Sequence, residues 1–337
     1  MSPLPSVVHL DASTLRELTP FPLLIDALAA AFASPPIAPE RERHCLSGHE
    51  ALPDALLVMP AWRTGDLMGV KLVTVFPGNA QQGLATINGL YVLFSAVTGE
   101  LLATIDAEEL TVRRTVAASA LASRYLSRAE SSRLLIVGTG RIAARIAAGH
   151  IAVRPITEIL IWGRDALKSD VLAREVSRTT GIRARAALDL HESVGAVDIV
   201  STATLSQTPL IEAKDVRPGT HIDLVGGFTS QMIEAEGELI ASAKLYVDQR
   251  SSVLREAGDI QDPIARGLIT ADHIQAELGE MCRGVEPGRQ DPESITVFKS
   301  VGVALEDLAC ASLAWNKLRA LRQELPVVTG ALTAAGR

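Results

Sequence analysis

The feature that most constrains the fold is a glycine-rich turn near the middle of the chain, Gly138-Thr139-Gly140-Arg141-Ile142-Ala143. An apolar run, Leu134–Val137, precedes it, and an alanine-rich stretch of helical character, Arg141–Ala152, follows. In this setting the first glycine permits a tight turn, and the second lets the backbone approach a pyrophosphate. The alanine permits close packing of helix on strand, and the free N–H groups of the helix start face the phosphates. The turn therefore predicts a dinucleotide-binding fold.

Short apolar runs alternate with helical stretches along the middle of the chain. Further strands are expected at Ile159–Trp162, Asp198–Ser201, His221–Val225 and Leu245–Asp248, with a weaker candidate at Arg183–Ala187 and a helix over Ala166–Thr180. This alternation is typical of a parallel sheet with helices on both faces. We therefore expect an α/β protein with a doubly wound parallel (Rossmann) sheet.

The end of the second predicted strand bears on the choice of cofactor. NAD-binding folds of this kind carry an acidic residue there, whereas this chain has Gly163 followed by Arg164. An arginine at this place accommodates a 2′-phosphate and favours NADPH over NADH. The alternative is that Arg164 is a solvated loop residue and that Asp165 contacts the ribose.

Residues 1–125 have a different pattern. The runs Val70–Phe76 and Leu90–Phe94 are typical of strands, and the turn Thr98-Gly99 joins the second to Leu101–Ile105 in an antiparallel hairpin. Asp106 then has the place of a helix N-cap, with Glu109 three residues on as in a capping box, and the helix is expected to end near Ser127.

Apolar residues return at helical spacing after Gly302, which predicts a C-terminal helix that packs back on the first part of the chain. The predicted organisation is a discontinuous α+β substrate-binding and dimerisation domain, residues 1–125 and 303–337. The nucleotide-binding domain, residues 126–302, is inserted into it.

Two adjacent arginines are separated by helical geometry. Arg114 shares a stripe with Leu110, Ala117 and Leu121 and is predicted to point inward, whereas Arg113 shares its face with Glu109 and is predicted to point outward and pair with it. A buried arginine requires an anion, so Arg114 indicates either a structural ion pair or a ligand site.

Other basic residues also occur beside apolar segments. Lys71 lies within a predicted strand, and Arg41 and Arg43 precede the apolar segment Ala55–Met59. An edge-strand lysine and solvated arginines are the ordinary interpretations. Together with Arg114, they are also suited to bind a small carboxylate, with the fork of an arginine and the point charge of a lysine.

Composition limits the remaining classes. The 337 residues are 47% hydrophobic and carry a net charge of −7, which argues against nucleic-acid binding. We expect no membrane association, because no apolar run approaches the ~18 residues of a membrane span. Cys45, Cys282 and Cys310 are scattered without metal-ligand spacing, so no metal site is expected. A cytoplasmic location fits these cysteines and a start without signal-peptide character.

The motifs taken in order resemble those of the ornithine cyclodeaminase/mu-crystallin family, over nearly the whole chain. They are Leu57-Val-Met59-Pro60, Gly69-Val-Lys71, Thr111-Val-Arg-Arg114-Thr115, Gly138-Thr-Gly140, Asp198-Ile-Val-Ser-Thr202 and Phe298-Lys299-Ser300-Val-Gly302. The resemblance implies a homodimer that acts on a small molecule. It assigns substrate-carboxylate binding to Lys71 and Arg114, which are also the expected catalytic residues. Arg41 assists them, and Met59 and Thr86 lie near the substrate or nicotinamide.

The cofactor contacts expected from the turn, the second strand and the resemblance together form one set. It comprises Gly138, Thr139, Gly140, Arg141, Ile142, Arg164, Thr202, Ala203, Val225, Gly226, Lys299 and Ser300.

One departure selects a branch of the family. Cyclodeaminases of the family carry an aspartate after the strand that ends near Val225, and here Gly227 stands at that place. The segment Asp223-Leu-Val-Gly-Gly-Phe-Thr-Ser-Gln-Met232 resembles the branch that reduces Δ1-pyrroline-2-carboxylate to L-proline, and Glu256-Ala-Gly258-Asp259 continues the likeness.

We therefore predict NAD(P)H-dependent reduction of this cyclic imine, with Δ1-piperideine-2-carboxylate, the precursor of L-pipecolate, as a further candidate substrate. Three alternatives stay open: a cyclodeaminase lyase, an alanine or opine-type amino-acid dehydrogenase, and a crystallin-like NADPH-binding protein without enzymatic activity.

Overall fold

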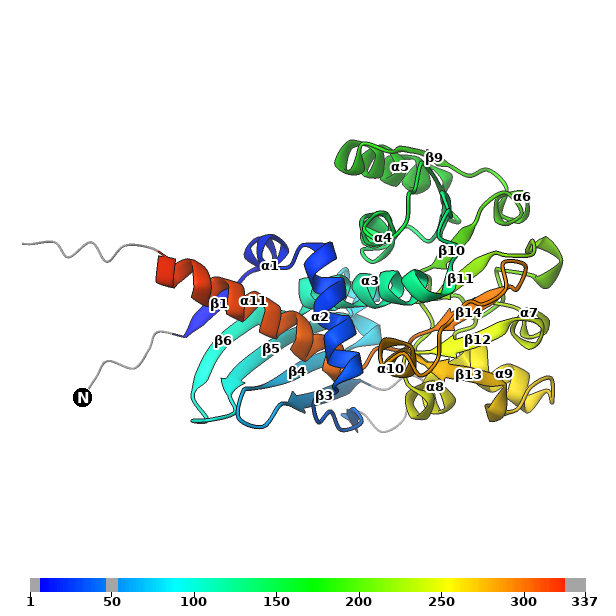
Figure 1. Ribbon diagram of the computed structural model, residues 1–337. Coiled ribbons are helices and arrows are strands. Elements are labelled where there is room, and N and C mark those ends of the chain that lie inside the picture. Colours follow the sequence, from blue (N-terminus) through cyan, green and yellow to red (C-terminus); the bar gives the residue numbers. More distant parts are fainter. Residues whose placement is uncertain (1–6, 47–53, 325–337) are drawn as a thin grey trace, which may run out of the picture.

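The structure is a computed structural model that describes residues 7–46 and 54–324, and it contains two β-sheets joined by a long central helix (Figure 1). That helix, α3 (Ala107–Leu126), contacts strands of both sheets. Residues 1–6, 47–53 and 325–337 of the predicted discontinuous domain lie outside the described residues.

The first sheet has six strands in the order β1-β6-β5-β4-β3-β2. Their bounds are β1 Val8–Leu10, β2 Glu42–Cys45, β3 Ala55–Trp62, β4 Leu67–Val75, β5 Ile87–Ser95 and β6 Leu101–Asp106. Only β1 is parallel to its neighbour. The predicted β5–β6 hairpin is confirmed, with Gly99 at φ +75° in its turn. A 3-10 turn, η1 (Pro77–Gln82), joins β4 to β5.

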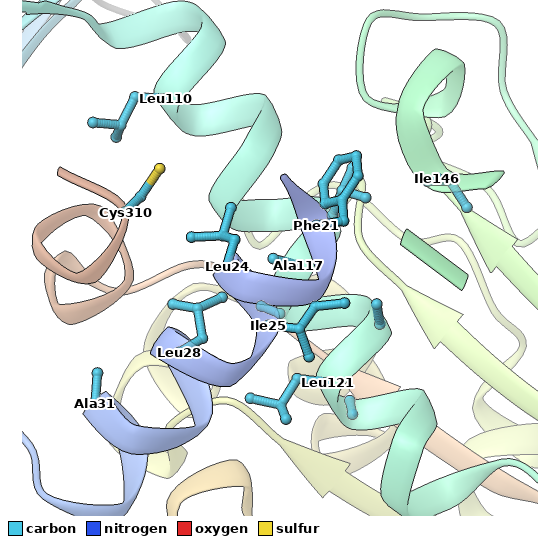
Figure 2. Close-up of a cluster of buried hydrophobic side chains, with 14 of the residues drawn as sticks. Phe21, Leu24, Ile25, Leu28, Ala31, Leu110, Ala117, Leu121, Ile146 and Cys310 are labelled. Atoms are coloured by element: carbon cyan, nitrogen blue, oxygen red, sulfur yellow. The ribbon is translucent and has the colours of Figure 1, made fainter. Parts of the chain in front are cut away.

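Helices cover one face of the first sheet. Helices α1 (Ala12–Leu18), α3 and the C-terminal α11 (Ala304–Glu324) lie against its strands, and α2 (Phe21–Ala33) packs on α3 and α11. Figure 2 shows Leu24 and Leu28 of α2 meeting Leu110 and Leu121 of α3 and Cys310 of α11 in a buried apolar cluster. Helix α11 thus packs back on the N-terminal part, as predicted from its apolar spacing. The domain limits after residues 125 and 302 remain our proposal, which this arrangement supports.

The second sheet is the predicted doubly wound parallel sheet, with eight strands in the order β13-β12-β14-β11-β10-β7-β8-β9. Its strands are β7 Arg133–Val137, β8 Glu158–Trp162, β9 Arg183–Ala186, β10 Ile199–Thr202, β11 His221–Leu224, β12 Lys244–Val247, β13 Ile274–Glu277 and β14 Thr296–Lys299. Strands β13 and β14, of four residues each, were not predicted from the sequence.

Short helices connect these strands. They are α4 (Ala143–Ile151), α5 (Ala166–Thr180), α6 (Leu190–Val194), α7 (Gly237–Ser242), α8 (Arg250–Glu256), α9 (Gly258–Ala265) and α10 (Leu278–Cys282), with 3-10 turns η2 (Ala213–Asp215) and η3 (Ala271–His273). Among the described residues, no helix combines the length and apolarity needed to cross a bilayer.

The environment of α3 corrects one prediction. Asp106 caps the helix by accepting the N–H of Glu109, as expected. Arg113, predicted to face solvent, is buried: it donates to the backbone oxygen of Thr19 and lies 4.5 Å over the ring of Phe21. The side chain of Glu109 lies 3.8 Å from Arg113 and 3.4 Å from Arg16. The outward assignment was wrong because α1, α2, α4 and α11 all pack around α3 and leave it without a solvent face at this position.

Candidate active site

A cavity of about 550 Å³ opens where strands β7, β8 and β10 end. This is the switch point of the sheet, where the chain winds outward in both directions from β7, and ligands of doubly wound sheets bind at such a point. The cavity is lined by Gly138, Thr139, Gly140, Trp162, Gly163, Arg164, Ala203, Thr204, Leu205, Ser206, Gln207, Thr208 and Leu210. The segment after Ala203 was not predicted, because it carries no glycine pattern.

The two glycines of the turn fit a dinucleotide in different ways. Gly138 has φ +127°, and a Cβ there would lie 2.6 Å from the carbonyl oxygen of Ala203, so only glycine fits. A Cβ at Gly140 would have no atom within 4 Å, so the backbone at this position is open to a ligand. The turn can therefore hold a pyrophosphate against its backbone, which the sequence pattern required.

The residues that follow β8 differ in their surroundings. A Cβ at Gly163 would lie 2.8 Å from Cγ2 of Thr139, so a side chain there would require Thr139 to move. Asp165 caps α5 by accepting the N–H groups of Leu167 and Lys168. The carboxylate of Asp165 is therefore engaged, whereas Arg164 is exposed and lines the cavity.

The other predicted cofactor residues lie around this edge of the sheet. The N–H of Val225 donates to Thr202 at 2.9 Å and that of Ser300 donates to Leu224 at 3.3 Å, which brings the ends of β10, β11 and β14 together. Gly226 donates to the buried carboxylate of Glu234 at 2.8 Å. Just after the glycine turn, Arg141 is ion-paired with Glu108 and Ile142 is partly buried against the core.

The side chain of Lys299 points into the interior. Its ammonium is fully buried and forms an ion pair of 2.9 Å with Asp259. Any contact of Lys299 with a cofactor therefore goes through its backbone.

Lys71 lies on a central strand rather than an edge. Across the sheet it is in register with Met59 of β3 and Tyr91 of β5, and all three are buried. Its ammonium lies 2.8 and 2.9 Å from the two carboxylate oxygens of Asp307, in the first turn of α11. The edge-strand interpretation is therefore wrong, and this charge is held in the interior.

Arg114 reaches the same place from α3. It is buried, as its helical phase predicted, and its Nη1 lies 2.7 Å from Glu306 while its Nε lies 3.2 Å from Asp307. The guanidinium packs on Gly302, which has φ +77° and whose missing Cβ would collide with Arg114. Glu306 and Asp307 were not predicted from the sequence. The available signal was two adjacent acids in an otherwise apolar stretch from Val301 to Leu308.

Arg41 holds the loop before α11. Its Nη2 donates to the carbonyl oxygens of Val301 and Gly302, at 2.9 and 2.7 Å, and its Nε lies 3.2 Å from Glu256. The N–H groups of the same two loop residues donate to Asp248. Arg41 and Arg114 therefore contact the same loop, Arg41 through its carbonyl groups and Arg114 by packing on Gly302. The motif alone did not indicate this shared contact.

The other predicted members of the site are more distant. Arg43 is exposed on the edge strand β2. Thr86 precedes β5 by one residue and is five residues from Tyr91, or roughly 17 Å along an extended strand. The structure does not bring Arg43 or Thr86 into the Lys71–Arg114 cluster.

Burial shifts the ionisation of this cluster. Desolvation lowers the pKa of Lys71 to about 8, although Asp307 opposes the shift. Desolvation raises the pKa of Glu306 to about 7, against the attraction of Arg114 and with further repulsion from Asp248 and Asp307. For Arg114, burial alone would lower the pKa, but Asp307 and Glu306 raise it. The pKa of Glu306 therefore lies near neutral pH.

Gly227 does not face this cluster. A Cβ there would lie 3.0 Å from Oδ2 of Asp259 and 3.1 Å from Nζ of Lys299, toward the buried pair. The first side chain of this loop that reaches solvent is Phe228, which is 37% exposed. A side chain at this position would therefore crowd the Asp259–Lys299 pair.

Comparison with known proteins agrees with the motifs. The model of the ornithine cyclodeaminase/mu-crystallin family matches residues 8–321. An uncharacterised protein of Schizosaccharomyces pombe is 41% identical, with 92% of this chain and 97% of that protein covered. The Δ1-pyrroline-2-carboxylate reductase of Colwellia psychrerythraea is 34% identical, with 92% and 98% covered.

Solved structures show the same architecture. The Δ1-pyrroline-2-carboxylate reductase of Thermococcus litoralis, in complex with NADH and L-proline, superposes with a TM-score of 0.87 at 32% identity, over 94% of this chain and 98% of that one. An archaeal alanine dehydrogenase dimer with bound NAD superposes with a TM-score of 0.85 at 28% identity, over 94% and 97%. With a family match over nearly its whole length and this shared fold, the chain belongs to the ornithine cyclodeaminase/mu-crystallin family.

Proposed function

We propose that the protein is an NAD(P)H-dependent reductase of Δ1-pyrroline-2-carboxylate that forms L-proline, with Δ1-piperideine-2-carboxylate as a second candidate substrate. The observation that carries the proposal is the pair of buried cations, Lys71 and Arg114, on the core face of a sheet. The relatives named as reductases of this imine support the choice of substrate.

In this proposal the protein binds and orients the reactants, the cofactor supplies the hydride to the imine carbon, and a proton from water goes to the imine nitrogen. Arg114 offers a planar fork and Lys71 a point charge to the substrate carboxylate, which positions the ring. Arg41 acts through the Val301–Gly302 loop, whose carbonyl groups it binds. The glycine turn holds the pyrophosphate through backbone N–H groups. Fixing both reactants in this way is the main contribution that a hydride transfer requires.

The test is a comparison of three substrate sets on the purified protein. Loss of absorbance from NADPH or NADH is followed with Δ1-pyrroline-2-carboxylate, and separately with pyruvate plus ammonia. Ammonia release is assayed with L-ornithine and NAD⁺. We expect rapid turnover only with the cyclic imine. Ornithine-dependent ammonia release at a comparable rate would replace the reductase with a cyclodeaminase, and turnover of pyruvate would indicate an amino-acid dehydrogenase.

We also propose NADPH as the preferred cofactor, with NADH as a weaker substitute. Arg164 lines the cavity beside Gly163, and Asp165 is engaged in capping. Replacing Arg164 by Ala removes a charge-assisted contact worth about 1.5–3 kcal/mol, so KM for NADPH is expected to rise roughly tenfold to hundredfold. KM for NADH should change little. Equal changes for both cofactors would contradict a role for Arg164 at the 2′-phosphate.

A homodimer through the open face of the first sheet completes the proposal. Cross-strand rows on this face are apolar: Val58, Leu72 and Leu90 form one row, and Pro60, Val70 and Val92 the next. Leu72 and Leu90 are 37% and 38% exposed. An apolar sheet face of this kind is complementary to a second copy of itself in a two-fold dimer, and the alanine dehydrogenase relative is a dimer.

Light scattering on a sizing column tests this assembly. We expect a dimer for the wild type and a monomer for the double variant Leu72→Glu/Leu90→Glu. Leu188→Glu, at a position that is 94% exposed on another part of the surface, is the matched control and should leave the mass unchanged. A double variant that stays dimeric would place the interface elsewhere.

A further inference from the structure

The buried acids behind the two cations have no role in the function proposed above. Glu306 and Asp307 are fully buried in the first turn of α11, and between them they contact Arg114 and Lys71. We propose that both are positioning residues for the substrate-carboxylate site, and that Glu306 takes up a proton when the carboxylate binds. The inference rests on the proposed role of Lys71 and Arg114.

The geometry assigns different tasks to the two acids. Asp307 bridges the cations: its oxygens lie 2.8 and 2.9 Å from Lys71 Nζ, and one of them lies 3.2 Å from Arg114 Nε. Among the described residues, the side chain of Glu306 forms an ion pair only with Arg114, through one oxygen at 2.7 Å. The second oxygen of each acid, Oε1 of Glu306 and Oδ2 of Asp307, is buried without a hydrogen-bond partner. Asp307 therefore fixes the distance between the two cations, and Glu306 is the acid held by fewer contacts.

The charge balance then requires a proton. Two cations and two ionised acids sum to zero, so an arriving carboxylate would add one uncompensated negative charge to a buried cluster. Such a charge is costly in a low-dielectric interior, and a group that can neutralise itself does so. Glu306 is the group that can do this without releasing Lys71 from Asp307. Protonation of Glu306 leaves Arg114 free to pair with the ligand.

Other charged groups around the cluster do not remove this requirement. Arg41 contributes a third cation, but Glu256 pairs with it at 3.2 Å. Asp248 is buried and accepts the N–H groups of Val301 and Gly302. Tyr91 and Cys310 face Asp307 from β5 and α11, and burial raises the pKa of both groups, that of Cys310 to about 12, so neither adds a negative charge near neutral pH.

The pKa of Glu306, raised to about 7 by burial, sets the pH at which the effect is measurable. At pH 7 about half of Glu306 is ionised in the free protein, so binding should take up about half a proton from this group. Lys71, with a pKa lowered to about 8, adds only about a tenth of a proton at the same pH.

The experiment is calorimetric titration of the NADPH-saturated full chain with pyrrole-2-carboxylate, a stable planar monocarboxylate of the same ring size. Titration at pH 7 in buffers of different ionisation enthalpy gives the number of protons taken up. We expect about 0.6 proton for the wild type and about 0.1 for Glu306→Gln. Glu306→Asp keeps the acid and should retain most of the uptake, which also covers the case in which Glu306→Gln does not fold.

Asp307→Asn is tested by the pH dependence of KM for the cyclic imine. Loss of the carboxylate beside Lys71 should raise KM on the order of tenfold to hundredfold. It should also shift the alkaline rise in KM from near pH 8 to lower pH, because burial and the charges of Arg114 and Arg41 lower the pKa of Lys71 once Asp307 no longer opposes them. A merely structural acid would lower stability without moving this rise. Asp26→Asn, which removes an exposed partner of Arg124, is the matched control and should change neither quantity.

Two further variants separate failure of this inference from failure of the proposed function. If Lys71→Ala and Arg114→Ala bind the probe as the wild type does, the anion site itself is wrong, and the inference falls with it. If they lose binding while Glu306→Gln still takes up about 0.6 proton and Asp307→Asn keeps the wild-type KM profile, the anion site stands and only the inference is overturned.

Discussion

Replacing Gly302 by Ala is expected to weaken catalysis through Arg114, although Gly302 offers no functional group of its own. The residue has φ +77°, and the guanidinium of Arg114 occupies the space that a Cβ would take. The left-handed backbone conformation costs about 1–2 kcal/mol for a residue other than glycine. The added methyl group also forces Arg114 away from its 2.7 Å contact with Glu306.

The magnitude follows from the contact that is lost. A hydrogen bond between charged groups is worth about 1.5–3 kcal/mol, so the unfolding free energy of Gly302→Ala should fall by about 2.5–5 kcal/mol in total. A misplaced Arg114 should also lower kcat/KM for the cyclic imine roughly tenfold to hundredfold.

Gly65→Ala is the matched control, because it introduces the same left-handed backbone strain as Gly302→Ala but no clash with a neighbouring side chain. Gly65 has φ +76°, and a Cβ there would meet nothing within 4 Å. Its unfolding free energy should fall by about 1–2 kcal/mol, and kcat/KM should not change. Urea unfolding and steady-state kinetics on both variants decide the matter. Equal effects on kcat/KM would refute the argument that Gly302 places Arg114.

Three further outcomes are expected. In Arg113→Ala the free energy of unfolding, measured in urea, should fall by about 2–4 kcal/mol, because the hydrogen bonds to Thr19 and the contact with Phe21 are lost. Its kcat/KM should stay within about twofold of the wild-type value. An unchanged free energy of unfolding would contradict the buried placement of Arg113. Gly227→Asp should have a lower Tm than Gly227→Ala and should release no ammonia from L-ornithine, because the new carboxylate is forced toward that of Asp259. A variant that is as stable as Gly227→Ala and releases ammonia would contradict this expectation. The folded-state pKa of Glu306, about 7, lies above its ordinary value of 4.5, so its contribution to stability is complete below pH 4.5 and is lost as pH rises to 7. The free energy of unfolding of the wild type, relative to that of Glu306→Gln, should therefore fall on the order of 3 kcal/mol between pH 4.5 and 7. Thermal unfolding of the two proteins at several pH values tests whether the difference falls or rises with pH.

Local patterns were sufficient where short-range geometry decides the outcome. The glycine turn between Val137 and Ala143 predicted the edge of the sheet at which the cavity opens, because the conformation of such a turn depends on the turn residues and their immediate neighbours. The spacing on α3 predicted that Arg114 is buried, and the β5–β6 hairpin followed from Gly99 in the same way.

Only the tertiary structure could show which side chains from distant parts of the chain contact those elements. Arg113 was misplaced because a helical phase identifies a face but does not reveal that other helices cover the opposite side. Glu306 and Asp307 were missed because they are more than 190 residues from Arg114 and Lys71, and the sequence does not show which charges α11 brings against β4 and α3. Lys299, at the end of β14, matched a cofactor motif, but its partner Asp259 comes from α9, and the ion pair holds the ammonium in the interior. Periodicity along one element determines which side chains are buried, and the packing of elements distant in sequence determines which charges they meet there.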